Sequence, residues 1–461
     1  ITDKDYINER TLDIVFSPDG SHFAATDTLG RIGLFRFGSP YSTNENEKKE
    51  WTLVGRYQFG ETIGINSFTF NEAGSKIFCC TQDKYLHEFE LNKTSKYEAN
   101  KLPAPRSNKI EYDGDINCLV MSPLHNNRDH IIMSNSEFKL RLVGTAASNV
   151  TTDNYFIVKQ TSLGPTYGKP VSKLRIVPGM DKDKRVLAFS TDYKIFGLLY
   201  LPIDGNPYRM MGVIGHPRQI KEIRTSKNLD YIFTTGGNDY VINVWKHNIH
   251  PLIDAVQSGG EGIDPHLTLL EGGRDGLMYQ EMVNFFYYTQ IKSKDENTTK
   301  PRTLGDYVDK IYIHGLMAAM GFYPSQADLN YMYNEIKYSR SETEKYDKAL
   351  ENNFTFDLFV KLYINHRPYK DIEYEKFNKA FDKIRNYLDS TSNSIARDKL
   401  VELLKDYGEK MEEKQISECL DILTGDGNIK NLKDQITSDY FYHDILKFDE
   451  NANVEEETTV Q

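Results

Sequence analysis

The residues with the clearest potential for chemistry lie in the C-terminal half, where the order helix, loop, short strand, helix is typical of EF-hands. An EF-hand calcium loop needs oxygen ligands at positions one, three and five, glycine at six and a bidentate glutamate at twelve. One loop has Asp347 and Glu351 at positions one and five, but Ala349 at three and Leu358 at twelve. This loop therefore lacks a calcium site.

The other three loops lead to the same expectation. Placing the short-strand apolar residue at position eight puts Lys399 at position twelve of the third loop and Tyr440 at position twelve of the fourth. The first apparent loop, residues 292–303, has no ligand pattern. We predict no metal and no cofactor at any of the four.

Nucleotide binding and catalysis have weaker signals still. The glycine-rich segment 272–276 precedes a helix, where backbone amides can bind phosphate, but it lacks the Lys-Ser/Thr of a Walker loop and a preceding strand. A tight linker turn is favoured. No nucleophile–base pair or carboxylate dyad stands out, and the eleven histidines are scattered. We predict that the protein is not an enzyme.

The N-terminal half consists of a repeated β-strand pattern. Five units follow a pattern of two apolar positions and a Ser- or Asn-like end, from which Thr11 and Val177 depart: Thr11/Ile14/Ser17, Ile65/Phe68/Asn71, Ile116/Leu119/Ser122, Val171/Leu174/Val177 and Ile220/Ile223/Ser226. The spacing of about 50 residues indicates WD-type propeller blades with long inter-strand loops. Five units predict five four-stranded blades over residues 1–250. The ring either closes within this chain or needs blades upstream of Ile1.

Several residues of this repeat are predicted to be structural. Each unit after the first has a turn acid three residues before an apolar strand residue, and such acids accept turn hydrogen bonds. Trp245 is expected to be a buried packing residue of the last blade. The structural set comprises Asp83, Asp192, His216, Asp239 and Trp245.

After a linker at residues 251–275, apolar residues recur at helical spacing. We predict two calmodulin-like lobes of degenerate EF-hands at residues 276–368 and 369–448, followed by an acidic tail at 449–461. The fold class is therefore a multidomain chain, with all-β WD40-type blades before an all-α pair of lobes. Apolar residues of the lobes that could bind a partner helix are Phe285, Phe286, Met317, Met320 and Met332 in the first and Phe381, Leu400, Leu403, Leu404 and Met411 in the second. For any single one of them, packing in the lobe's own core is the simpler interpretation.

Composition limits the class of partner. The chain has 461 residues and a formal charge of −11. Residues 1–250 contain 31 basic and 28 acidic residues, whereas residues 251–461 contain 25 and 39, so the halves carry +3 and −14. Neither half has the concentrated basic character that nucleic acid binding requires, and no apolar run has the length of a membrane span. A basic protein or peptide fits the acidic half.

Four segments carry a resemblance to a known family. They are FTTGGNDYVINVWK at 233–246, LLEGGRDGLMYQEMVNFFYYTQI at 269–291, MGFYPSQADLNYMYNEIKYS at 320–339 and LYINHRP at 362–368. In order and spacing, the chain resembles the C-terminal part of the cilia- and flagella-associated WD-repeat proteins of the calmodulin- and spoke-associated complex.

The resemblance implies a non-catalytic scaffold of the ciliary or flagellar axoneme, which anchors a radial spoke to the doublet microtubule and supports motility. It implies as partners the other subunits of that complex, calmodulin (directly or indirectly), proteins of the radial spoke base and the doublet microtubule itself. The alternative is an EF-hand calcium sensor that regulates dynein-driven beating, which the missing position-twelve glutamates disfavour.

Overall fold

A computed structural model describes most of the chain. The described residues are 10–38, 50–60, 63–91, 97, 100–112, 114–124, 129–145, 155–177, 186–226, 231–237, 239–294, 305–338, 352–370, 373–388, 392–408 and 410–448. The predicted acidic tail at 449–461 and the potential ligands Asp347 and Glu351 lie outside these residues. The chain divides into two compact units, residues 1–369 and residues 370–461, and each is described by itself.

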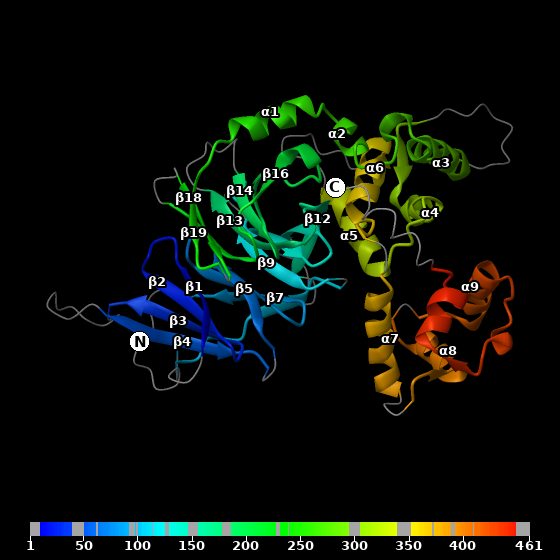
Figure 1. Ribbon diagram of the computed structural model, residues 1–461, viewed down its shortest axis with the longest axis horizontal. Helices are drawn as coiled ribbons and strands as arrows, with labels where there is room; N and C mark the ends of the chain where they lie inside the picture. The colour runs from blue at the N-terminus through cyan, green and yellow to red at the C-terminus, as the bar shows by residue number, and fades with distance from the viewer. Residues whose placement is uncertain are drawn as a thin grey trace. The chain divides into compact units, whose positions relative to one another are not determined.

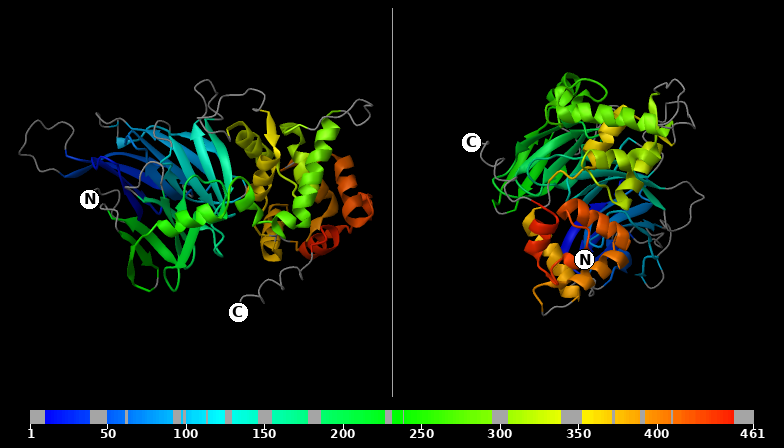
Figure 2. Two further views of the ribbon diagram at one scale, coloured as in Figure 1. Left: turned by 90° about the horizontal axis from the view of Figure 1, so that it is seen from above. Right: turned by 90° about the vertical axis from the view of Figure 1, so that its right-hand side faces the viewer.

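The first unit contains a five-bladed β-propeller, as the repeat predicts (Figures 1 and 2). Its strands are β1 (Thr11–Phe16), β2 (His22–Asp27), β3 (Arg31–Phe37), β4 (Trp51–Gln58), β5 (Ile65–Phe70), β6 (Lys76–Thr81), β7 (Tyr85–Glu90), β8 (Arg106–Lys109), β9 (Ile116–Met121), β10 (His130–Asn135), β11 (Lys139–Thr145), β12 (Phe156–Leu163), β13 (Val171–Val177), β14 (Val186–Thr191), β15 (Ile195–Tyr200), β16 (Met210–Ile214), β17 (Ile220–Thr225), β18 (Tyr231–Gly236) and β19 (Ile242–Lys246). Four sheets have four antiparallel strands in sequence order, and the last has three.

The sequence repeat corresponds to one position in each sheet. The first residue of each repeat begins the first strand of a blade: Thr11, Ile65, Ile116, Val171 and Ile220. At each of these positions the pairing register with the second strand shifts by one residue, as in a β-bulge. Bulges re-aim a strand locally, so the spacing seen in the sequence marks where each blade begins.

The fifth blade differs from expectation. It has three described strands, β17, β18 and β19, and β19 is therefore an edge strand. Trp245 on β19 is half-buried instead of buried, because among the described residues no fourth strand covers it. Its indole still packs on Phe196 of the preceding blade, at a centroid distance of 5.5 Å. An ion pair of 3.5 Å joins Arg224 of β17 to Asp13 of β1, and it links the last blade to the first.

The segment expected to be a linker is partly helical and contributes to a core. It contains α1 (His250–Ser258), α2 (Asp264–Leu267) and the 3-10 turn η5 (Gly273–Asp275). Ile263, Leu267 and Leu270 are buried in the hydrophobic cluster of the helices that follow. The glycine-rich segment is a tight turn, in which Gly272 and Gly273 adopt φ values of 71° and 57°.

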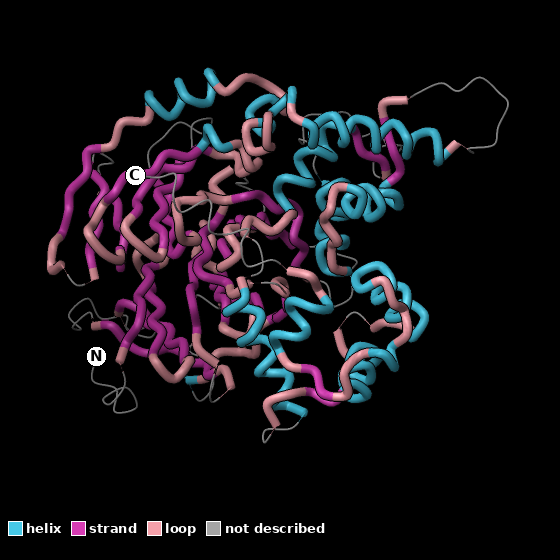
Figure 3. The backbone as a smooth tube through the Cα atoms, turned by 45° about the vertical axis from the view of Figure 1, so that its right-hand side comes forward, coloured by secondary structure: helices cyan, strands magenta, loops and turns pink. Residues whose placement is uncertain are grey.

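Helices replace strands after this turn (Figure 3). The first unit continues with α3 (Leu277–Ser293), β20 (Tyr307–Asp309), the 3-10 turn η6 (Lys310–Tyr312), α4 (Ile313–Ala319), α5 (Gln326–Tyr338), β21 (Asn353–Thr355) and α6 (Phe356–His366). β20 pairs with β21, with Val308 opposite Phe354. A loop at residues 292–303 would place its short strand at position eight, which is residue 299. The strand residue that pairs is Val308, nine residues later, so the predicted position of the first loop was wrong. Within residues 306–320, β20 and η6 come before the short helix α4.

The second unit repeats the pattern with the predicted register. It consists of α7 (Tyr374–Leu388), β22 (Ile395–Ala396), α8 (Arg397–Asp406), α9 (Glu413–Thr424), the 3-10 turn η8 (Ile429–Asn431), β23 (Gln435–Ile436) and the π-helical turn η9 (Tyr440–Ile445). Ile395 pairs with Ile436, and these are the residues predicted at position eight of the third and fourth loops.

His87 in β7 provides a test of the propeller core. Burial lowers the pKa of its imidazole to about 4, and its ring nitrogens lie 2.9 Å from Thr81 Oγ1 and 2.6 Å from Ser107 Oγ. The unfolded chain takes up this proton near pH 6.5. Because the unfolded chain binds this proton more readily than the folded one, His87 should not lower the free energy of unfolding above pH 6.5. As the pH falls towards 4, it should lower that free energy by up to about 3 kcal/mol.

Urea unfolding at several pH values measures this loss. A His87→Gln variant should show a shallower fall in unfolding free energy between pH 6.5 and 4 than the unaltered chain. His250→Gln, at an exposed position of α1, is the matched control and should follow the unaltered chain. Parallel curves for His87→Gln and the unaltered chain would contradict the assignment.

Candidate partner-binding site

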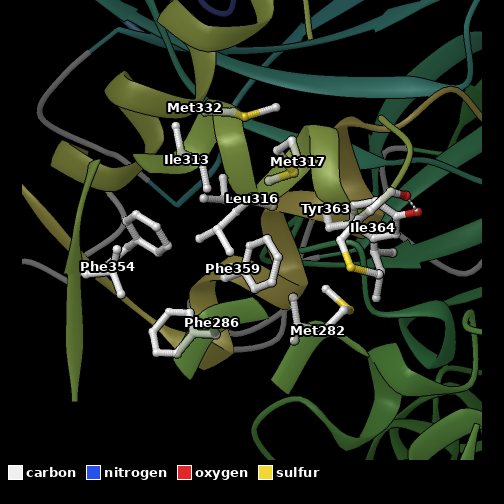
Figure 4. Packing of buried hydrophobic residues seen from close by; sticks show 14 of the residues in the cluster. Met282, Phe286, Ile313, Leu316, Met317, Met332, Phe354, Phe359, Tyr363 and Ile364 are labelled. Atoms are coloured by element: carbon white, nitrogen blue, oxygen red, sulfur yellow. Dashed lines mark hydrogen bonds between the residues drawn. The ribbon is translucent and has the colours of Figure 1, made fainter. Parts of the chain in front are cut away.

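We call α3 to α6 the first helical region and α7 to η9 the second. The predicted partner-binding residues of the first helical region lie in one hydrophobic cluster (Figure 4). Met317 and Met332 are 0% exposed, Phe286 is 3% and Met320 is 7% exposed. Phe285 is partly buried against the same cluster. In this structure these side chains fill the region's own core.

Helical spacing brings the cluster together. Met282 and Phe286 lie one turn apart on α3, and Phe359 and Tyr363 lie one turn apart on α6. The Phe286 ring stacks on Phe359 at 6.2 Å. It also meets the edge of Phe354 from β21 at 6.1 Å. The short β-pair and the two helices therefore share one aromatic core.

One face of this helical region packs against the third propeller blade, where α5 and α6 run beside β12 (Figure 1). β12 is the edge strand of its sheet, so some of its backbone N–H groups have no strand partner. Glu335 of α5 accepts a hydrogen bond from the Thr161 N–H at 3.2 Å. The same carboxylate oxygen lies 3.0 Å from Nε2 of His366. Both Glu335 and His366 are buried, so the pair satisfies groups that water cannot reach.

Asn365 of α6 makes the second contact with this edge. Its side-chain oxygen accepts from the Leu163 N–H at 3.0 Å, and its amide N–H donates to the Asp204 carbonyl at 3.2 Å. Asn365 is 1% exposed. Gly205, at φ 81°, leaves the space that the amide occupies, since a Cβ there would lie 1.9 Å from Asn365 Oδ1.

Lys139 binds the C-terminal end of α6. Its ammonium group donates to the carbonyls of Asn365 and Arg367, each at 2.6 Å. The last carbonyls of a helix generally lack a partner within it, and a cation at a helix C-terminus is also favoured by the helix dipole. Burial lowers the pKa of the Lys139 ammonium to about 7.

Tyr331 of α5 extends the contact towards the second blade. Its hydroxyl donates to the Ile110 carbonyl at 2.9 Å. The Arg141 guanidinium lies 4.0 Å from the centre of its ring, and Glu111 holds that guanidinium at 2.7 and 2.9 Å. All of these side chains are buried. The helical region is therefore joined to the propeller by satisfied polar groups as well as by apolar packing.

Sequence reasoning did not find these contact residues. Lys139, Arg141 and Glu111 are not among the residues that the sequence patterns single out. One signal was available, because Asn365, His366 and Arg367 belong to LYINHRP, one of the segments that carried the family resemblance. Charged and amide residues on an apolar helix indicate a buried polar contact.

The second helical region packs its predicted residues less completely. Phe381 and Leu400 are 5% and 6% exposed, in a cluster with Ile395 and Ile436. Leu403, Leu404 and Met411 are half-buried.

The predicted structural residues of the last blade form one hydrogen-bonded chain. The Trp245 indole N–H donates to Thr234 Oγ1 at 2.8 Å, and that hydroxyl lies 2.9 Å from His216 Nε2. His216 Nδ1 donates to Asp239 at 2.7 Å, and this bond lowers the pKa of the Asp239 carboxyl. Thr234, which was not predicted, is the central member.

The two other predicted turn acids lie in separate blades. Thr81 donates to Asp83, and Gln219 donates to Asp192 at 2.6 Å. Asp83 accepts its bond within its own turn, whereas the donor to Asp192 lies 27 residues further along, just before β17 of the next blade.

The described residues contain no group of three or more His, Cys, Asp and Glu side chains placed to hold a metal ion. Over the same part of the chain, no helix combines the length and apolar character needed to cross a membrane.

Comparison with known proteins shows which family the chain resembles. Residues 277–446, which include both helical regions from α3 onward, match the CFAP251 C-terminal domain. Over most of its length the chain is similar to cilia- and flagella-associated protein 251. The resemblance predicted from four short segments is thereby confirmed.

Several relatives carry this name. The protein from Tetrahymena thermophila is 29% identical over 97% of this chain and 48% of its own length. The mouse protein is 29% identical over 89% of this chain and 30% of its own length, and the protein from Pongo abelii is 27% identical over 91% and 35%. The chain thus spans half or less of these relatives. Their names indicate a cilia- and flagella-associated protein and support the predicted ciliary or flagellar location.

Gly205 offers a direct test of the contact between α6 and the propeller. Gly205→Ala should combine the strain of a positive φ with a clash against Asn365, whose amide is fixed by two hydrogen bonds. We expect a loss of about 3 kcal/mol in unfolding free energy. The rate of amide hydrogen exchange in α6 should increase in the same variant.

Gly168→Ala is the matched control. Gly168 has nearly the same φ, 78°, but nothing lies within 4 Å of a Cβ built there. The free energy of unfolding of this variant should fall by only about 1 kcal/mol, because backbone strain is the only cost. Equal losses for the two variants would show that the space beside Asn365 is not required.

Proposed function

We propose that the protein is a non-catalytic scaffold of the ciliary or flagellar axoneme, as a subunit of the calmodulin- and spoke-associated complex at the base of a radial spoke. The observation that carries the scaffold role is the buried polar contact between α5, α6 and the edge of β12. It makes the propeller and the first helical region one body through side-chain and backbone groups of the chain itself. Such a body presents several surfaces in a fixed arrangement, which suits a structural subunit.

The complex and its spoke are supported by the family resemblance. The relatives' names connect the chain with cilia and flagella. The other proposed partners are the remaining subunits of that complex, calmodulin, the spoke base proteins and the doublet microtubule.

The second helical region is the proposed holder of an amphipathic partner helix. In the first region, four of the five predicted residues are buried in its own core. In the second, Leu403, Leu404 and Met411 keep part of their apolar surface accessible. A basic helix fits best, because residues 251–461 contain 39 acidic and 25 basic residues.

A pull-down from solubilised axonemes tests this role. The tagged chain of 461 residues should recover identified subunits of the complex, by mass spectrometry, equally in calcium and in a calcium chelator. The physical reason is that none of the four loop sequences supplies the position-twelve glutamate with which calcium changes an EF-hand. Recovery only in calcium would favour the sensor alternative, and no recovery would contradict the scaffold.

A pair of variants tests the partner helix. Leu403→Glu should reduce recovery of the subunit bound there by about tenfold or more, because a carboxylate would replace an apolar contact. Ile422→Glu is the control, since Ile422 is 83% exposed on α9 and is not among the predicted residues. The melting temperature of each variant is measured in parallel. A folded Leu403→Glu variant with unchanged recovery would show that the helix binds elsewhere.

A further inference from the structure

A cavity of about 470 Å³ lies where α3 meets the beginning of α6, on the first helical region. Its size falls within the range of about 300 to 1,000 Å³ typical of ligand sites. The lining residues come from α3, from residues 305–306 and from the turn that starts α6: Tyr279, Val283, Phe286, Tyr287, Gly305, Asp306, Thr355, Phe356 and Asp357. None of the functions considered above uses this cavity.

Aromatic rings form much of its wall. The Phe356 ring meets Tyr279 edge-on at 5.8 Å and Phe286 edge-on at 5.5 Å, so the three side chains hold one another in place. Tyr287 is 46% exposed and opens the wall to solvent. Aromatic faces carry negative charge density and attract cations.

Two carboxylates complete the cavity. Asp306 and Asp357 both line it and both are exposed. In the described part of the chain, neither side chain makes a hydrogen bond or a salt bridge, although the charge of Asp357 interacts with that of Arg274. Each can therefore accept hydrogen bonds from a bound cation without first losing an internal partner.

The rim already shows the chemistry that such a wall supports. The Arg274 guanidinium lies 5.6 Å from the centre of the Tyr279 ring. Arg274 pairs with Asp264, outside the set of lining residues. A guanidinium is thus accommodated on the face of one wall residue, where its charge also interacts with that of Asp357.

We propose that this cavity binds an arginine side chain of a protein partner. Its planar guanidinium can stack on the aromatic wall while its N–H groups reach Asp306 or Asp357, whereas a lysine ammonium is a more strongly hydrated point charge. The excess of 39 acidic over 25 basic residues in residues 251–461 adds a long-range attraction for a basic partner. The inference concerns this cavity alone and does not depend on a place in the spoke complex.

Fluorescence anisotropy with short peptides tests the proposal on the full chain. The probe is the peptide acetyl-Ala-Leu-Arg-Leu-Ala-amide carrying a neutral dye. Its counterpart contains citrulline, which keeps the size of arginine without its charge. The arginine peptide should bind about tenfold more tightly than the citrulline peptide, and its affinity should fall with added salt. Equal binding of the two, or tighter binding of the corresponding lysine peptide, overturns the proposal.

Variants of the wall locate the binding. Asp306→Asn and Asp357→Asn keep the side-chain shape, and each should lower the affinity for the arginine peptide about fivefold. Tyr287→Leu keeps the net charge but removes a ring face, and it should weaken binding by about threefold. Glu281→Gln, at an exposed position of α3 that does not line the cavity, is the control for net charge and should leave affinity unchanged. If Glu281→Gln weakens binding as much as the Asp variants, or if Tyr287→Leu has no effect while the variant stays folded, the cavity is not the site.

Discussion

The first unit depends on how the edge of one propeller blade is covered. β12 is the last strand of its sheet, and an uncovered edge strand exposes backbone groups that would pair with another chain. Glu335 and Asn365 accept hydrogen bonds from two of its N–H groups, Thr161 and Leu163. Removing either acceptor would leave a buried donor without a partner, which costs about 1 to 3 kcal/mol.

This contact also decides what the first helical region can do. In a calcium sensor, metal binding opens a helix pair and exposes a methionine-rich groove. Here Met317 and Met332 are fully buried, and α5 and α6 contact β12 on their other side. Opening these helices would separate Asn365 and Lys139 from their partners and expose the aromatic core around Phe286. A stable support is consistent with this packing.

Charged groups are used in two ways in the molecule. Lys139, Arg141 and Glu111 are buried at the contact between propeller and helices, each with its hydrogen bonds satisfied, and they fix one geometry. Asp306 and Asp357 are exposed on an aromatic-lined cavity in the same unit and have no hydrogen-bond or salt-bridge partner among the described residues. Buried, hydrogen-bonded charges are typical of structural polar networks. Exposed carboxylates beside an aromatic-lined cavity are typical of ligand-binding sites.

The sequence by itself determined the features that depend on local pattern. Strand alternation recurs in each blade and the turn acid in each blade after the first, so the five repeats located the five sheets. Ile395 and Ile436, predicted at position eight of their loops, are the residues that pair. The same reasoning placed the first loop of the helical region wrongly, because its short strand is fixed by the pairing of Val308 with Phe354, 46 residues further along the chain. It also left the blade-to-helix contact unseen. Lys139 is separated from Asn365 by 226 residues, and Leu163 from Asn365 by 202. No periodicity spans such distances, since these groups become neighbours only when the propeller and the helices have folded against each other.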